Sequence, residues 1–186
     1  PPVRHAMLSR WKSLCTTDGK PMESAERQSD DSDSIEWLLA RVNYERTTGV
    51  PYGERQLKLD RMLQLVNLLG HPDRNYPIIH VAGTKGKGST AAMIAAVLSA
   101  AGYRTGVYSS PHLSRLEERF AIGGLPIATE DLGGLLDRIR PLVDEVDRRA
   151  TPTGEPALTY FDIATAAALV YFSEQGCQSV VLEVGL

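Results

Sequence analysis

The sequence predicts an α/β fold in which a parallel sheet with a P-loop-type connection is flanked by helices. Short apolar runs at 77–83, 103–110 and 178–185 have the length and composition of buried strands. Segments with helical patterns separate these runs, and the first run leads through a glycine-rich loop straight into a helix. Because strands that alternate with helices pair in parallel through right-handed crossovers, the three runs are expected in one sheet.

Two helices are expected before the first strand. Ser34 is the predicted N-cap of a helix that runs through IEWLLARVNYERT, and a second helix with an apolar stripe covers about 55–69. A turn rich in glycine and proline separates them, and Gly70 ends the second. Residues 1–33 show no periodicity and end in a polar, acidic run. We therefore expect a disordered segment or an extension there, with the domain occupying 34–186.

The remaining elements follow from similar local signals. An alanine-rich segment at 89–102 predicts a helix that ends at a glycine, and Gly-Gly within 118–127 predicts a small hairpin. Thr129, followed by two acidic residues, is expected to cap a charged helix. The apolar segment 160–174 predicts a further helix, directly before the third strand.

Bulk properties of the chain limit its partners. The 186 residues carry a net charge of −3, so there is no basic footprint for nucleic acid. No run of about 18 apolar residues occurs, so no membrane span is predicted. Cys15 and Cys177 stand far apart without metal-ligand spacing. We therefore expect two bystander thiols in a reducing compartment, and a cytoplasmic, monomeric protein.

The segment IIHVAGTKGKGSTAAMIAAVL (78–98) carries the strongest chemical signal. Three glycines let the backbone amides turn toward one point, and the following helix directs its positive end at the same point. Such a loop holds an anion, and Lys87, the predicted catalytic residue, can reach the β- and γ-phosphates of a nucleotide. Either Ser89 or Thr90 supplies a hydroxyl for phosphate or Mg²⁺. The predicted ATP-binding residues are consecutive: Gly83, Thr84, Lys85, Gly86, Lys87, Gly88, Ser89 and Thr90.

The strict P-loop motif is not met. G-x-x-x-x-G-K-[ST] requires a hydroxyl residue directly after the lysine, and Gly88 stands between Lys87 and Ser89. This spacing argues against a nucleotide-dependent switch or a transporter ATPase. The simplest alternative is a glycine-rich turn without a chemical role. Three glycines, a lysine and two hydroxyls between a strand and a helix favour a phosphate site instead.

The variant spelling HVAGTKGKGST resembles the GTNGKGS loop of folylpolyglutamate and dihydrofolate synthases, a family within the Mur ligase superfamily. Cell-wall members of the superfamily usually carry GTNGKT, with Thr at the position of Gly88. Lys85 here takes the position of the usual Asn. The resemblance covers about 35–186 through four blocks in order. It implies the amino-terminal part of the Mur ligase central ATPase domain, truncated, with the glutamate-binding carboxy-terminal domain outside this chain.

Two further blocks imply a magnesium site. GVYSSPHLSRLEERF resembles the family's second block, which makes Ser110 a ligand of Mg²⁺ and places Arg119 in an -ER- pair. We interpret His112 as loop structure or a substrate contact in preference to an acid–base group. SVVLEVGL resembles the LEVGLGGR block, which makes Glu183 a second Mg²⁺ ligand. Chemistry agrees, because a carboxylate at the carboxyl end of a buried strand lies where such sheets bind ligands and is costly to bury without a cation.

A fourth block implies a pterin site. TYFDIATAAALVYF (159–172) resembles the block usually read TYFE, with Asp162 in place of Glu. The alternative is structural, since an acidic residue in the first turn of a helix favours its dipole and aromatic residues at this spacing pack in cores. A weaker match precedes the second predicted helix. The implied pterin-binding residues are Gln56, Leu57, Lys58, Thr159, Tyr160, Phe161 and Asp162.

The resemblance implies an ATP- and Mg²⁺-dependent ligase that joins L-glutamate to dihydropteroate or a folate through an acyl phosphate. The alternatives are a cell-wall Mur ligase that acts on a UDP-MurNAc-peptide, and a catalytically silent nucleotide- or folate-binding module. Because one wall of an interdomain cleft is present, we expect this chain to be inactive by itself. We also expect its last strand, 178–185, to present an unpaired apolar edge.

Overall fold

The computed structural model describes residues 33–44, 59–150, 152 and 156–185. A short helix covers 33–39. The later helices are α3 (Leu59–Leu68), α4 (Lys87–Ala100), α5 (Thr129–Ala150) and α6 (Tyr160–Glu174), with short 3-10 helices η2 (Pro72–Arg74) and η3 (Leu116–Arg119). The strands are β1 (Ile78–Val81), β2 (Thr105–Tyr108), β3 (Phe120–Ile122), β4 (Leu125–Pro126) and β5 (Ser179–Glu183).

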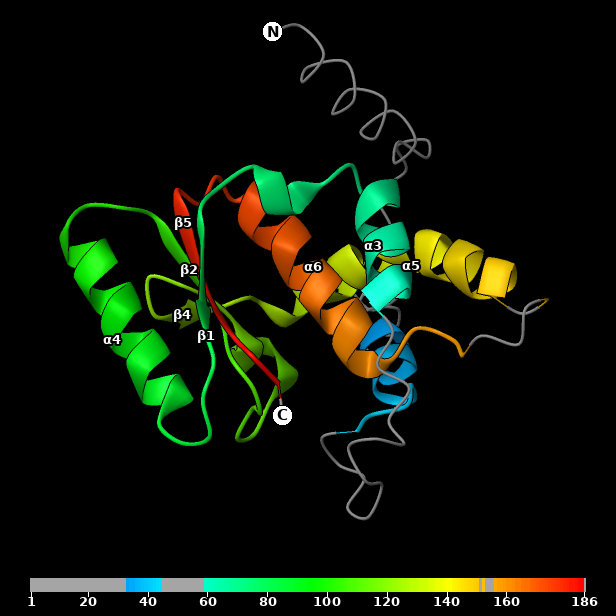
Figure 1. The fold of residues 1–186 in the computed structure, drawn as a ribbon, viewed down its shortest axis with the longest axis horizontal. Coiled ribbons are helices and arrows are strands. Elements are labelled where there is room, and N and C mark those ends of the chain that lie inside the picture. The colour runs from blue at the N-terminus through cyan, green and yellow to red at the C-terminus, as the bar shows by residue number, and fades with distance from the viewer. Residues whose placement is uncertain (1–32, 45–58, 151, 153–155, 186) are drawn as a thin grey trace, which may run out of the picture.

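The strands form one five-stranded sheet in the order β1-β5-β2-β3-β4, with helices on both faces. Helix α4 lies on one face, while α6 lies on the other and packs against α3 and α5 (Figure 1). The α/β prediction is therefore confirmed. Strand β5 pairs in parallel with both β1 and β2, so the two strands that flank the glycine-rich loop and α4 run in the same direction, as expected.

A hairpin makes the sheet mixed. Strand β3 pairs antiparallel with β2 and with β4, and the predicted Gly-Gly turn lies between β3 and β4. Gly123 and Gly124 both have positive φ, at 60° and 82°, which a two-residue hairpin turn requires. The parallel sheet expected from the sequence is thus confirmed for β1, β5 and β2, and the hairpin extends it with antiparallel strands.

The expectation that the last strand presents an unpaired edge is wrong. Strand β5 lies between β1 and β2, and all five of its residues are buried. A strand that is apolar on both faces gains most from a central position, because helices cover it on both sides. Within the part of the chain that the structure describes, the edge strands are β1 and β4, and Ile78 of β1 is 36% exposed.

The first helix is shorter than predicted. It covers 33–39, and Ser34 lies within it rather than at its cap, with its hydroxyl donating to the carboxylate of Asp137 in α5. Beyond the helix, the carbonyl of Val42 accepts a hydrogen bond from the amide of Tyr160, at 3.0 Å. This long-range contact joins the start of the described chain to the start of α6.

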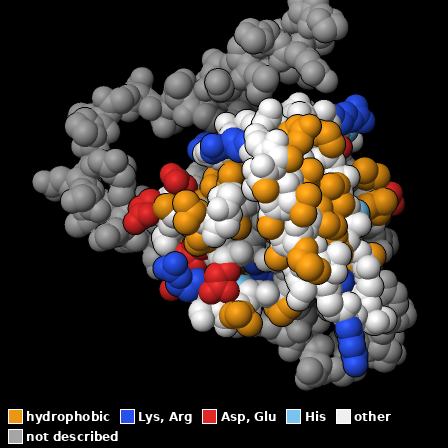
Figure 2. Space-filling view, turned by 90° about the vertical axis from the view of Figure 1, so that its left-hand side faces the viewer, with side chains coloured by type: hydrophobic (Ala, Val, Ile, Leu, Met, Phe, Trp, Pro, Cys, Tyr) orange, Lys and Arg blue, Asp and Glu red, His pale blue; other side chains and the backbone are white. Residues whose placement is uncertain are grey.

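Helix α4 is exposed although it is apolar. Ala91 and Ala95 are its buried residues, while Met93 is 62% and Val97 69% exposed. Hydrophobic side chains gather on the face of the molecule that this helix presents (Figure 2).

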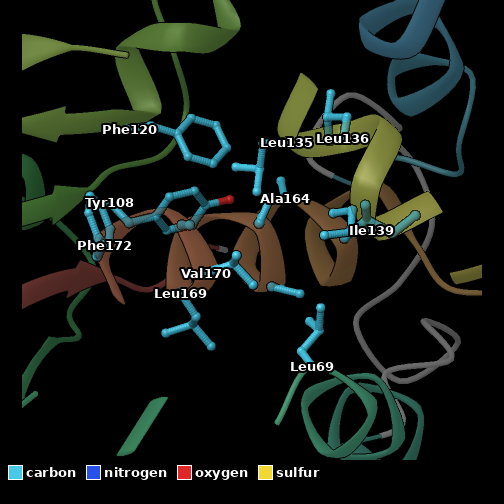
Figure 3. Packing of buried hydrophobic residues seen from close by; sticks show 14 of the residues in the cluster. Leu69, Tyr108, Phe120, Leu135, Leu136, Ile139, Ala164, Leu169, Val170 and Phe172 are labelled. Atoms are coloured by element: carbon cyan, nitrogen blue, oxygen red, sulfur yellow. The ribbon is translucent and has the colours of Figure 1, made fainter. Parts of the chain in front are cut away.

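The main core lies on the opposite face of the sheet. Nine of the 15 residues of α6 are buried, and its side chains pack against aromatic residues of β2 and β3 and against leucines of α5 (Figure 3). The closest approach is at Gly106 of β2, where a Cβ atom would lie 2.5 Å from Cδ1 of Phe172. Glycine is therefore needed at position 106 so that the helix can reach the strand.

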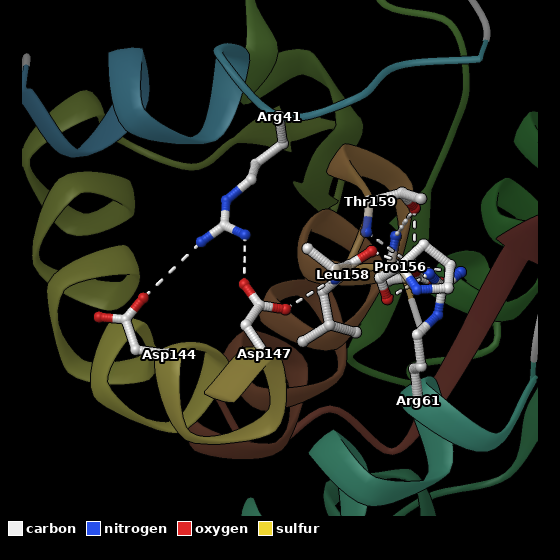
Figure 4. Close-up of polar contacts among 9 residues, drawn as sticks. Arg41, Arg61, Asp144, Asp147, Pro156, Leu158 and Thr159 are labelled. Carbon is white, nitrogen blue, oxygen red and sulfur yellow. Dashed lines mark hydrogen bonds and ion pairs between the residues drawn. The ribbon is translucent and has the colours of Figure 1, made fainter. Parts of the chain in front are cut away.

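Two arginines tie the helices together beside this core (Figure 4). Arg61 of α3 is 2% exposed and donates to the carbonyls of Pro156 and Ala157, both at 2.8 Å, while its guanidinium lies 3.8 Å from the carboxylate of Asp162. Arg41 pairs with two aspartates of α5, Asp144 and Asp147. These contacts fix the segment that enters α6.

Two further findings bear on the expectations from composition. Among the residues that the structure describes, no helix combines the length and the apolar character needed to cross a membrane. Cys177 is buried, and burial raises the pKa of its thiol, which keeps it protonated. Cys15 lies outside the described residues.

Candidate nucleotide and metal site

Three segments converge at the carboxyl edge of the parallel strands. Glu183 is the last residue of β5 and is in register with Val81, the last residue of β1. The glycine-rich loop leaves β1 at this point, and the loop that contains Ser110 leaves β2 on the other side of β5. The central strand therefore places its terminal carboxylate between the two loops, where doubly wound sheets bind ligands.

The glycine-rich loop ends in an uncapped helix. Gly86 is the N-cap of α4 with φ at 74°, a left-handed conformation that favours glycine. No side chain caps the helix, and its first turn contains no acidic residue. The first amides of α4 are therefore available to an anion. Lys87 folds back over the loop, with Nζ donating to the carbonyl of Gly83 at 3.0 Å.

The structure distinguishes the two hydroxyls that follow the loop. Thr90 Oγ1 donates to the carbonyl of Gly86 at 2.9 Å, which is the usual back-bond of a threonine within a helix. The Ser89 side chain is exposed and makes no hydrogen bond to the described residues. Ser89 is therefore the better placed of the two to meet a phosphate or a metal.

Ser110 and Glu183 lie close together, as the sequence predicts. The amide of Ser110 donates to Oε2 of Glu183 at 3.3 Å, although 73 positions separate the two residues. Ser110 is 7% and Glu183 6% exposed. Gly88 faces the same carboxylate, and a Cβ atom there would lie 3.4 Å from Oε2 and 3.8 Å from Oε1. A side chain at position 88 would thus cover the carboxylate, and glycine leaves it open.

A cavity of about 340 Å³ lies beside this group. Its walls come from α4, the end of β2, the loop after β2 and the end of β5. The lining residues are Gly88, Ala92, Val107, Ser109, Ser110, Pro111, His112, Leu113, Glu118 and Glu183.

The donors at this cavity fit Mg²⁺ shared with a phosphate. In the described part of the chain, no three His, Cys, Asp or Glu side chains group closely enough to hold a metal by themselves. Mg²⁺ is commonly held by one or two protein oxygens together with phosphate oxygens and water. One buried carboxylate and one serine beside a phosphate-type loop match this pattern, and they do not match an all-protein metal cage.

His112 is held by Arg119. The Nε of Arg119 donates to Nδ1 of His112 at 2.9 Å, and the guanidinium lies 5.2 Å from the ring centre of Tyr160. The Nδ1 atom of His112 is thus engaged within the loop. The arrangement favours the interpretation of His112 as part of the loop structure.

Sequence reasoning missed Glu118. Its carboxylate lines the cavity and accepts hydrogen bonds from three backbone amides of the loop after β2. Glu118 was visible only as the first member of the -ER- pair, and its three-residue spacing from Arg115 matches the carboxylate half of a capping box, because an arginine side chain has no acceptor for the other half.

The described residues implied for the pterin site do not line this cavity. Thr159 caps α6, and Asp162 closes the capping box by accepting from the amide and hydroxyl of Thr159 at 2.9 and 2.7 Å. Tyr160 is fully buried, while Phe161 is half-buried with its ring centre 6.2 Å from that of Tyr108. The positions 56–58 lie outside the described residues. The pterin assignment therefore stays a prediction.

Comparisons with known proteins identify relatives and solved structures that resemble this chain. No family model matches the chain. A dihydrofolate synthase/folylpolyglutamate synthase of Bacillus subtilis is 39% identical over 155 residues, which cover 83% of this chain and 33% of the relative. A solved folylpolyglutamate synthase of Mycobacterium tuberculosis, complexed with ADP and AMPPCP, aligns with a TM-score of 0.74 and 33% identity over 86% of this chain and 32% of that one. A solved FPGS–AMPPCP–folate complex aligns with a TM-score of 0.68 and 30% identity over 84% of this chain and 34% of that one.

The sheet order, the loop between β1 and α4 and these structural matches define a segment with the Mur ligase fold. Within that fold, the chain is similar to folylpolyglutamate/dihydrofolate synthases over the part that it shares with them. It spans about a third of the length of the curated relatives that it matches.

Proposed function

We propose that the protein containing this chain is an ATP- and Mg²⁺-dependent ligase that joins L-glutamate to the carboxylate of dihydropteroate, of a folate, or of both. The observation that carries the proposal is the meeting of Ser110, Glu183 and the uncapped start of α4 at one cavity. Relatives that carry the names of such enzymes, and solved relatives that bind ADP, AMPPCP and folate, support it.

The glycine-rich loop would bind the nucleotide. Its amides and the amino end of α4 would face the phosphates, and Lys87 would exchange its bond to Gly83 for a phosphate oxygen. Ser89 would add a hydroxyl, since Thr90 already donates within the helix. All eight residues from Gly83 to Thr90 stay assigned to this role. ATP, when bound, supplies the phosphoryl group that activates the acceptor carboxylate for attack by an amine.

Ser110 and Glu183 would hold Mg²⁺ at the inner wall of the cavity. Their burial lowers the local dielectric response, so charges placed there interact strongly. The metal, when bound, neutralises negative charge on the phosphates. The contribution of the chain would be to hold Ser110 beside the Glu183 carboxylate before the ligand arrives, because preorganised groups need no rearrangement during the reaction.

The pterin would bind at the start of α6 and at the residues before α3. Of the two aromatic side chains there, Phe161 is the one that reaches the surface, since Tyr160 is fully buried. Asp162 has a structural role in the capping box, and contact with a ligand would be additional. Gln56, Leu57 and Lys58 complete the assignment that the family resemblance implies.

The remaining parts of the proposal concern the whole protein. The glutamate site would lie in a further domain, and the 186-residue chain by itself would not complete the reaction. The complete protein would be a cytoplasmic, monomeric enzyme. A cell-wall ligase is not favoured, because the relatives at 39–40% identity are named for folate substrates.

The test is a product assay. The complete protein is incubated with ATP, Mg²⁺, L-glutamate and either dihydropteroate or tetrahydrofolate, and products are identified by mass. We expect the acceptor mass to increase by one glutamate residue with one or both acceptors, and no product from the 186-residue chain. Nucleotide binding without product from the complete protein, with either acceptor, would point to the catalytically silent module instead.

A further inference from the structure

The loop that follows β2 is held by the chain's own carboxylate. Glu118 in η3 accepts hydrogen bonds from the amides of Leu113 at 2.8 Å, Ser114 at 3.1 Å and Arg115 at 3.0 Å. Three successive amides that converge on one point form a nest for an anion. Here the anion is the side chain of Glu118, three to five residues further along, so the loop binds a group of its own chain.

The next residue fixes the other half of the same loop. Arg119 is 1% exposed and donates from Nε to Nδ1 of His112, at 2.9 Å. Its carbonyl accepts from the amide of Ser109 at 3.2 Å. Ser110 and Pro111 therefore lie between two segments that η3 holds in place.

The position of Ser110 depends on these bonds. Ser110 contacts Glu183 through its amide at 3.3 Å, at the long end of the range for an N–H···O bond. That single bond is a weak restraint. By contrast, Glu118 accepts three shorter hydrogen bonds from the amides of residues 113–115, which follow Ser110. Without Glu118, three amides at the rim of the cavity would lose their acceptor and the loop would exchange them for water.

We propose that Glu118 is a positioning residue, whose carboxylate holds the loop so that Ser110 faces Glu183 across the metal position. This inference rests on one part of the proposed function, the binding of Mg²⁺ by Ser110 and Glu183. Residues that orient the ligands of a metal contribute to metal affinity without touching the metal. A purely structural role would change the stability of the protein and leave the metal dependence of nucleotide binding unaltered.

The experiment measures two quantities in the complete protein. The variants are Glu118→Gln, which removes the charge, and Glu118→Asp, which shortens the side chain and keeps the charge. Glu130→Gln is the matched control, because Glu130 is an exposed acid in the first turn of α5. Hydrogen exchange reports the amides of 113–115, and calorimetry reports the affinity for AMPPCP with and without Mg²⁺.

In Glu118→Gln, we expect faster hydrogen exchange at the amides of 113–115. Mg²⁺ raises the affinity for AMPPCP by some factor in the wild-type protein, and we expect that factor to be about 10- to 100-fold smaller in the variant. The affinity without Mg²⁺ should not change, since the glycine-rich loop carries it. Glu118→Asp should fall between wild type and Glu118→Gln, and Glu130→Gln should match wild type. If Glu118→Gln does not fold, the same measurements on Glu118→Asp decide the question.

The proposal is overturned if Glu118→Gln keeps the full Mg²⁺-dependent gain, or if the wild-type protein shows no such gain. Failure of the proposed ligase activity would have a different signature. A wild-type protein that binds Mg²⁺-AMPPCP but joins no glutamate to a pterin carboxylate would remove the proposed function and leave the role of Glu118 intact.

Discussion

Helices α4 and α6 lie on opposite faces of one sheet, and both are rich in alanine, yet they are buried to very different extents. Nine of the 15 residues of α6 are buried, against two of the 14 residues of α4. Helix α6 packs against β2, β3, α3 and α5, whereas α4 packs mainly against β1, β5 and β2. We infer that α6 maintains the fold and that the chief contribution of α4 is its amino end, which faces the cavity.

The largest expected effect is on activity at the start of α4. If the complete protein has the proposed activity, Lys87→Ala should lower ligation by at least roughly 10²–10³-fold, the scale on which loss of one charge-stabilising group acts. Unfolding in urea should be unchanged, because the residue is outside the core. Arg74→Ala, which removes an exposed cation from η2, is the control for charge. Activity of Lys87→Ala within about tenfold of wild type would show that Lys87 is not the phosphate lysine.

The next effect is on stability at α6. Phe172→Ala should lower the free energy of unfolding by about 3–5 kcal/mol, because the ring is fully buried and in contact with Gly106. Denaturant unfolding of the complete protein measures the change. A loss similar to that of a surface substitution would contradict the assignment of α6 as the helix that maintains the fold.

A smaller effect should depend on pH. The amide of Leu113, followed by that of Arg115, lowers the pKa of Glu118 below its ordinary value of 4.5. Folding therefore favours the ionised form, and the stabilisation is present above pH 4.5 and is lost as the pH falls through the lower folded value. The difference in unfolding free energy between wild type and Glu118→Gln should shrink in this acid range. A difference that stays constant down to full protonation would contradict a stabilising role for the bonds between the Glu118 carboxylate and the amides of 113–115.

The smallest effect is expected on the outer face of α4. Met93→Ser and Val97→Ser should each change the free energy of unfolding by no more than about 0.5 kcal/mol, because both side chains are mostly exposed. Thermal unfolding and the product assay should both match wild type. A destabilisation comparable to that of Phe172→Ala would mean that a further part of the complete protein covers this helix.

Local signals predicted several elements well. Helix α6 begins at Tyr160, as expected, because Thr159 and Asp162 form a capping box that involves only neighbouring residues. The hairpin between β3 and β4 follows from two glycines with positive φ. The first helix was predicted too long, and the segment after it bonds through Val42 to Tyr160, a long-range contact that no local pattern reveals.

The candidate site also contains residues that the sequence predicted and residues that it did not. Lys87 and the glycines around it follow one another in the sequence, so their spacing between a strand and a helix was sufficient to predict a phosphate loop. The three amides that bind Glu118 carry no side-chain signal, so a sequence motif could not identify them. The sequence could not predict that Tyr160 is buried, because an aromatic residue at the start of a helix can face either a ligand or the core.

The sequence by itself determined most of the elements, the glycine-rich loop between a strand and a helix, and the presence of a carboxylate at the end of an apolar strand. These features depend on backbone conformation and on residues within about one turn or strand of one another. Only the tertiary structure decided that β5 lies between β1 and β2, which places Glu183 beside both loops and brings it to Ser110. Strand order depends on which non-local pairing buries the most apolar surface, and that choice is made by the whole chain rather than by any one segment.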